Sequence, residues 1–144
     1  MNQKRPSFEY NGRSLGNVIL IGFQVLVGFI HILFGFWLLT APWITSLDFA
    51  PLSSVFDIYS FYTIVFGFLT LLFAVLLWFN KRWGWIGTFS VLVFVTIVDS
   101  LTLLDLPSIP GIPKFACFGE ITYSAILIFY LIQAHVRIKY KIKF

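Results

Sequence analysis

The sequence predicts an all-α membrane protein whose four helices cross the bilayer as an antiparallel bundle. Three observations point to this class. Charged residues make up only 11% of the 144 residues, whereas soluble domains carry about 25%. Mean hydropathy is +0.91. Four apolar runs, each long enough to cross about 30 Å of hydrocarbon as a helix, cover residues 17–39, 58–79, 83–104 and 115–134. We expect a single domain over 1–144.

Each run has its own boundary signals. The first is too long for a cleaved signal peptide, and we expect Pro42 to end its helix and residues 41–57 to form a loop. Only the segment "NKRW" separates the second run from the third, which predicts a tight antiparallel hairpin. No run alternates with a period of two, so strands are excluded.

The placement of positive charge predicts the orientation. Under the positive-inside rule, both termini and the second connection should be cytoplasmic, because they carry nine of the ten Lys and Arg residues: Lys4, Arg5, Arg13, Lys81, Arg82, Arg137, Lys139, Lys141 and Lys143. The opposite side carries Asp48, Asp57, Asp105 and Lys114. We expect the protein in the plasma membrane. Tryptophan residues should mark its two interfaces, outside at Trp37 and Trp43 and inside at Trp78, Trp83 and Trp85.

Small and polar residues recur at helical spacing on one side of each run, which predicts the faces that pack inside the bundle. These positions are Gln24, Gly28, His31 and Gly35; Tyr59, Thr63, Gly67, Thr70 and Ala74; Thr88, Val95, Asp99 and Thr102; and Glu120, Tyr123, Ser124 and Leu127. We expect the hydroxyl and amide groups among them to form hydrogen bonds between helices.

Three ionisable residues, His31, Asp99 and Glu120, fall in the outer half of their runs, and a convergence of their faces would join them in one cluster with Tyr62, Thr96 and Tyr123 nearby. Three interpretations compete. The carboxylates could lie shallow and reach water. The cluster could be a buried structural network. It could also bind a metal ion or relay protons, because His and carboxylates ligate zinc and similar metals, although no HxxxH, HExxH or ExxH pair supports this. Cys117 is expected to be a small buried apolar residue.

The hairpin "NKRWGWIG" and the C-terminal segment "YLIQAHVRIKY" resemble small four-span integral membrane proteins of archaea and some bacteria, most of them without an assigned function. Their fourth helix often ends in a pattern that Tyr130, Leu131, His135, Val136, Arg137 and Tyr140 match here, with Ala134 in place of the usual proline. The resemblance covers the second half of the chain and implies the four-helix fold.

Function is predicted mainly by what the sequence lacks. No nucleotide-binding, nucleophile-elbow or haem-attachment motif occurs, so we expect no enzyme, no cofactor and no nucleic-acid partner. The leading hypothesis is a non-catalytic subunit of a larger membrane complex, of the respiratory or monooxygenase type, whose partners are lipid and other membrane subunits or copies of itself. The alternatives are a small oligomeric ion or proton transporter or channel, and a metal-binding membrane protein that uses His31, Asp99 and Glu120.

Overall fold

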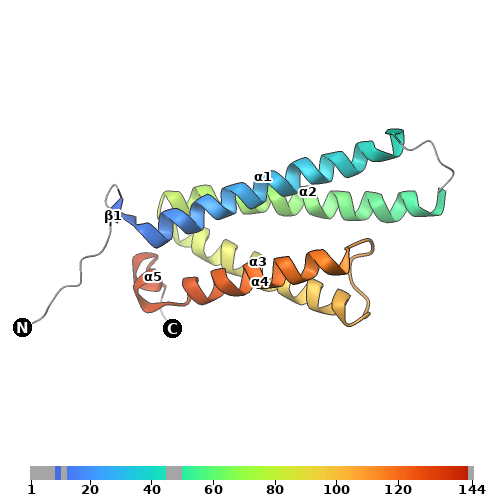
Figure 1. Cartoon of the computed structure of the whole chain (residues 1–144). Helices are drawn as coiled ribbons and strands as arrows, with labels where there is room; N and C mark the ends of the chain where they lie inside the picture. Colours follow the sequence, from blue (N-terminus) through green and yellow to red (C-terminus); the bar gives the residue numbers. More distant parts are fainter. Residues whose placement is uncertain (1–8, 11–12, 45–49, 143–144) are drawn as a thin grey trace, which may run out of the picture.

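Four long helices run antiparallel, and a short fifth helix turns across one end (Figure 1). They are α1 (Leu15–Ile44), α2 (Ala50–Trp78), α3 (Arg82–Leu103), α4 (Lys114–Leu131) and α5 (Ala134–Lys139). The computed structural model describes residues 9–10, 13–44 and 50–142, and the side chains of 15–40 and 58–142. Before α1, β1 (Glu9–Tyr10) pairs antiparallel with β2 (Arg13–Ser14).

The two ends of the bundle differ in what they carry. One end holds the start of α1, the α2–α3 turn and α5, and we call it the terminal end (Figure 1). The other holds the α1–α2 and α3–α4 connections, and we call it the loop end. Of the residues that enter the orientation argument, Lys4, Arg5, Asp48 and Lys143 lie outside the described part of the chain.

The helices described here include four that are long and apolar enough to cross a membrane, over Leu15–Thr40, Ile58–Trp78, Arg82–Leu103 and Lys114–Leu131. The prediction of four apolar helices is therefore confirmed. The starts of α1, α3 and α4 lie within two residues of the predicted ones, whereas α2 begins eight residues earlier than predicted. The expected loop over 41–57 is wrong, because α1 continues two residues past Pro42 and α2 begins at Ala50. Pro42 is so close to the end of α1 that it disrupts few helical hydrogen bonds. Pro51 stands in the first turn of α2, where backbone N–H groups have no partner within the helix.

The helices associate in sequence order: α1 packs on α2, α2 on α3 and α3 on α4, whereas α1 and α4 come close at few points. The α1–α2 seam is the most extensive, and glycines bring the two backbones together. A β-carbon added to Gly28 would lie 3.1 Å from the carbonyl oxygen of Gly67, and one added to Gly35 would lie 3.0 Å from that of Ser60. Small residues are what allow membrane helices to approach this closely.

The α2–α3 turn has a specific geometry at Asn80. Asn80 adopts a left-handed backbone with φ 53°, its N–H donates to the carbonyl of Leu77 at 2.9 Å, and the N–H of Lys81 donates to that of Leu76 at 2.9 Å. This is the Schellman arrangement, which satisfies the last carbonyls of a helix. Gly84 then lets α3 approach, since a β-carbon there would lie 2.5 Å from the backbone nitrogen of Leu77. The predicted hairpin is confirmed.

The fourth long helix ends at Leu131, three residues before the predicted end at 134. Gln133 has an extended backbone with ψ 137°, and the chain then turns into α5. The turn buries two residues of the C-terminal pattern, Val136 and Tyr140, against the terminal end of the bundle. Burying these side chains favours the break over a continued helix.

Tryptophan placement corrects one expectation. Trp85 is not an interface residue but belongs to the core, where its indole N–H donates to the carbonyl of Leu131 at 3.0 Å. Trp37, Trp78 and Trp83 are exposed, as an interface position requires. The side chain of Trp43 lies outside those described.

The predicted inward faces are confirmed for most positions. The buried members are Gln24, Gly28 and Gly35; Tyr59, Thr63, Gly67, Thr70 and Ala74; Thr88, Val95 and Asp99; and Ser124 and Leu127. The expected hydrogen bonds between helices are mostly wrong. The hydroxyls of Thr63 and Thr70 donate instead to the carbonyls four residues earlier, at 2.7 and 2.8 Å. A threonine in a helix always has this carbonyl within reach, whereas a partner on another helix must be placed by packing.

Candidate functional site

His31 is held in a fixed orientation on α1. Its Nδ1 lies 2.8 Å from the carbonyl oxygen of Val27, one turn earlier. Its ring stands edge-on to Phe66 of α2, with 4.7 Å between the ring centroids. The Nε2 atom therefore points across to α4, where it lies 3.5 Å from Oε1 of Glu120. The pair is partly accessible, with 17% and 22% of the two side chains exposed.

Asp99 of α3 is a fully buried carboxylate of this region. Its exposure is 0%, and neither carboxylate oxygen has a hydrogen-bond partner among the described residues. It lies close enough to Glu120, Cys117 and His31 to interact electrostatically with each. The interpretation in which Asp99 reaches water is therefore wrong, because its face of α3 turns into the bundle with the buried Val95 and Thr88.

Two more side chains complete the cluster. Tyr62 of α2 lies within electrostatic range of Glu120 and Asp99, and its buried hydroxyl has no hydrogen-bond partner among the described residues. Cys117 of α4 is fully buried and its thiol donates to the carbonyl of Pro113 at 3.5 Å. We call His31, Tyr62, Asp99, Cys117 and Glu120 the loop-end cluster.

The structure brings His31 against Glu120, with Asp99 and Tyr62 within electrostatic range, but it does not bring in all of the predicted neighbours. The hydroxyl of Thr96 donates to the carbonyl of Leu92 within α3. Tyr123 lines a separate cavity closer to the terminal end. Cys117 joins the cluster, and the sequence contains the signal for this, since Cys117 precedes Glu120 by three residues and Ser124 by seven and so shares their side of the helix.

The metal-binding interpretation gains no support from this arrangement. Within the described part of the chain, no three His, Cys, Asp or Glu side chains are grouped so that they could hold a metal ion. His31 also presents only one nitrogen to the cluster, because its Nδ1 faces the Val27 carbonyl. A zinc site needs at least three protein ligands directed at one point.

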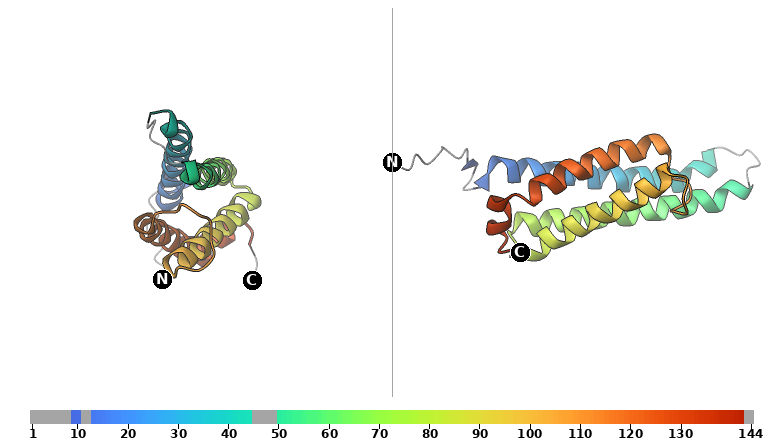
Figure 2. Two further views of the ribbon diagram at one scale, coloured as in Figure 1. Left: turned by 90° about the vertical axis from the view of Figure 1, so that its right-hand side faces the viewer. Right: turned by 90° about the horizontal axis from the view of Figure 1, so that it is seen from below.

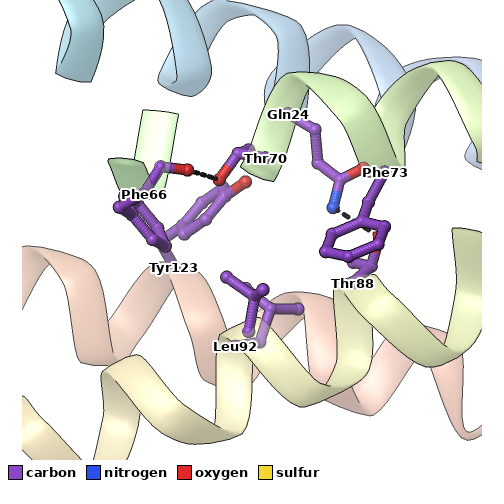
Figure 3. Close-up of a pocket in the computed structure, with 8 residues that line it drawn as sticks. Gln24, Phe66, Thr70, Phe73, Thr88, Leu92 and Tyr123 are labelled. Carbon is purple, nitrogen blue, oxygen red and sulfur yellow. Dashed lines mark hydrogen bonds between the residues drawn. The ribbon is translucent and has the colours of Figure 1, made fainter. Parts of the chain in front are cut away.

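A second polar position lies between the loop-end cluster and the terminal end, and Figure 3 shows the residues that surround it. The side-chain amide of Gln24 donates to the hydroxyl of Thr88 at 3.1 Å, which links α1 to α3. Beside them is a cavity of about 10 Å³, bordered also by Thr70, Phe73 and Tyr123. Among the described residues, neither Oε1 of Gln24 nor the hydroxyl of Tyr123 has a partner. A space of this volume holds about one water molecule, so it is not a substrate pocket.

The terminal end is closed by hydrogen bonds between distant parts of the chain. The amide of Asn17 donates to the hydroxyl of Tyr140 at 2.7 Å, and that hydroxyl donates to the carbonyl of Leu77 at 3.3 Å. The residues that carry the resemblance to small four-span proteins therefore have a structural role here: Leu131, Val136 and Tyr140 are buried in the core, and His135 stands edge-on to Tyr130. No known protein family, curated protein or solved structure matches this chain.

Proposed function

We propose that the chain is a non-catalytic subunit of a larger membrane assembly, for which a respiratory or monooxygenase-type enzyme is the expected example. The observation that supports this most is the loop-end half of α1. Near the loop end, α1 lies against α2 and stands farther from α3 and α4 (Figure 2, left), which it approaches at the His31–Glu120 contact. The side chains that it exposes are large and apolar: Phe29, Ile30, Leu33, Phe34, Phe36 and Trp37.

This surface is better suited to contact with other transmembrane helices than to contact with lipid alone. At 100° per residue, the six positions cover an arc of roughly 160° around α1, so nearly half of the helix circumference presents large apolar side chains. Four of the six side chains are aromatic, and aromatic residues are enriched at the buried centres of protein interfaces. Packing of apolar side chains, rather than exclusion of water, stabilises contacts between membrane helices.

The interior of the bundle favours a structural role over a transport pathway. Toward the terminal end, Asn17 and Gln24 form hydrogen bonds with other side chains of the bundle, and they lie beside an apolar core that includes Leu20, Ile21 and Leu77. A transporter or channel needs polar groups accessible through both halves of the membrane. The carboxylates and the histidine that face the interior, Asp99, Glu120 and His31, lie instead near the loop end.

The assembly is tested by photocrosslinking in native membranes. A benzophenone amino acid placed at Phe36 of α1 is expected to crosslink one polypeptide of constant mass, which also copurifies in stoichiometric amount in mild detergent. The same group at Phe129, an exposed phenylalanine of α4, is the matched control and should give lipid adducts. Lipid adducts at both positions, together with a monomeric mass by native mass spectrometry, would exclude the proposal.

The proposed orientation places the loop end outside the cell and the terminal end in the cytoplasm, with the chain in the plasma membrane. Its support is the excess of Lys and Arg in the tails and in the α2–α3 turn. A cysteine at Leu106, which is exposed in the α3–α4 connection, should react with a membrane-impermeant maleimide on intact cells. A cysteine at Lys81, exposed in the α2–α3 turn, should react only after permeabilisation. The native Cys117 is buried and gives the background. The reverse labelling pattern would invert the orientation.

A further inference from the structure

The hydrogen positions on His31 follow from its contacts. A carbonyl oxygen only accepts hydrogen bonds, so the Nδ1 atom that lies 2.8 Å from the carbonyl of Val27 must carry a proton. The state of Nε2 then depends on Glu120. A neutral imidazole with a proton on Nδ1 presents a lone pair at Nε2.

The contact between His31 and Glu120 requires one more proton. Nε2 and Oε1 lie 3.5 Å apart, and a lone pair that faced an ionised carboxylate at this distance would be repelled. Either His31 is doubly protonated and Glu120 ionised, or His31 is neutral and Glu120 protonated. Both arrangements give the pair a net charge of zero.

Asp99 is then the one charge that the cluster leaves without compensation. The ionisable groups that face it are His31 from α1, Tyr59 and Tyr62 from α2, and Cys117 and Glu120 from α4. Among these, only His31 can be positive, and its charge is matched by Glu120. An ionised carboxylate with no exposure costs several kcal/mol unless its charge is compensated, and the Cys117 thiol beside it is only a weak hydrogen-bond donor.

We propose that Asp99 and the His31–Glu120 pair form a proton-binding site that is loaded from the loop end. Asp99 is the buried acceptor, and the partly exposed His31–Glu120 pair is the entry, because Glu120 lies only six residues after Lys114, the first residue of α4 at the loop end. Loading takes up one proton from water, forms one O–H bond on Asp99 and changes the charge of the cluster from −1 to zero. This inference does not rest on the proposed subunit role, which requires no ionisable cluster.

The test is infrared spectroscopy of the full-length protein in lipid nanodiscs at neutral pH. The carbonyl stretch of a protonated carboxylic acid is separate from the bands of an ionised carboxylate. We expect such a band, expect it to shift when the chain is grown with ¹³C-labelled aspartate, and expect its loss in Asp99→Asn. The control is Asp105→Asn, because Asp105 is 76% exposed and lies 2.6 Å from Lys114; this variant should keep the band.

Two further comparisons test whether Glu120 is part of the proton entry and whether Asp99 binds a proton or sodium. In Glu120→Gln the labelled aspartate band should persist, but its shift on transfer to D₂O should be slower than in the unmodified chain. Replacing sodium chloride with choline chloride should leave the band unchanged. An aspartate band that appears only when sodium is removed would show that Asp99 binds sodium instead, and the proposal would be wrong. The absence of a protonated aspartate in the labelled, unmodified protein would also overturn it, even if Asp99→Asn failed to fold.

Discussion

Gly67→Leu is expected to separate α1 from α2 and to destabilise the bundle by more than about 3 kcal/mol. A β-carbon at Gly67 would lie 2.7 Å from the carbonyl oxygen of Gly28 and 3.0 Å from the backbone nitrogen of Ile32. Overpacking against side chains costs about 1–3 kcal/mol. The cost should be higher here, because two of the atoms that would have to move belong to the backbone of a regular helix.

The chain offers a matched control at Gly22, another glycine of the same hairpin. A β-carbon at Gly22 would meet nothing within 4 Å, so Gly22→Leu changes the same residue type in the same way on an exposed face of α1. The free energy of unfolding, measured by SDS titration in mixed micelles, should fall strongly for Gly67→Leu and change little for Gly22→Leu. Equal effects would mean that the α1–α2 seam is not the close contact described above.

The seam also matters for the loop-end cluster. His31 lies one turn beyond Gly28 on α1 and contacts Phe66, the residue before Gly67. Moving α1 away from α2 would therefore carry His31 away from Glu120. In Gly67→Leu protein that remains folded, we expect the His31–Glu120 contact to be lost, whereas Gly22→Leu should preserve it.

The sequence predicted the inward faces because helical spacing alone determines which residues share a side. Gln24, Thr63, Asp99 and Ser124 are buried as that spacing requires. The same spacing also predicted the depth of Asp99 along α3, but not its isolation from water. Depth follows from distance to the helix end, whereas isolation depends on which neighbours cover that face, and those neighbours come from α1, α2 and α4.

The parts that could not be predicted depend on contacts between distant residues. Nothing in the segment Ile132–Gln133 is a glycine or a proline, so no local signal marks the end of α4. The break is favoured by the burial of Val136 and by the hydrogen bond from Asn17 to Tyr140, two residues that are 123 positions apart. Pro42 is the opposite case. Proline is a strong local signal for the end of a helix, and α1 does end two residues after it.

Trp85→Ala is expected to have the second large effect, by opening the terminal end. Trp85 is 4% exposed, its ring lies parallel to that of Phe89 with 5.1 Å between centroids, and its N–H donates to the carbonyl of Leu131. Truncating a buried tryptophan costs about 3–5 kcal/mol in soluble proteins. We expect about 3 kcal/mol here, because lipid replaces part of the apolar contact that unfolding removes.

Two further variants divide this effect into its causes. Trp83→Ala removes a tryptophan that is 71% exposed and should change the free energy of unfolding little. Trp85→Phe retains an aromatic ring next to Phe89 but leaves the Leu131 carbonyl without its indole donor, which should cost about 1–3 kcal/mol. Because this carbonyl belongs to the last residue of α4, both Trp85 variants should also speed amide exchange in α5. If Trp85→Ala and Trp83→Ala destabilise equally, Trp85 is an interface residue after all, and α5 is held in place by Asn17 and Tyr140 alone.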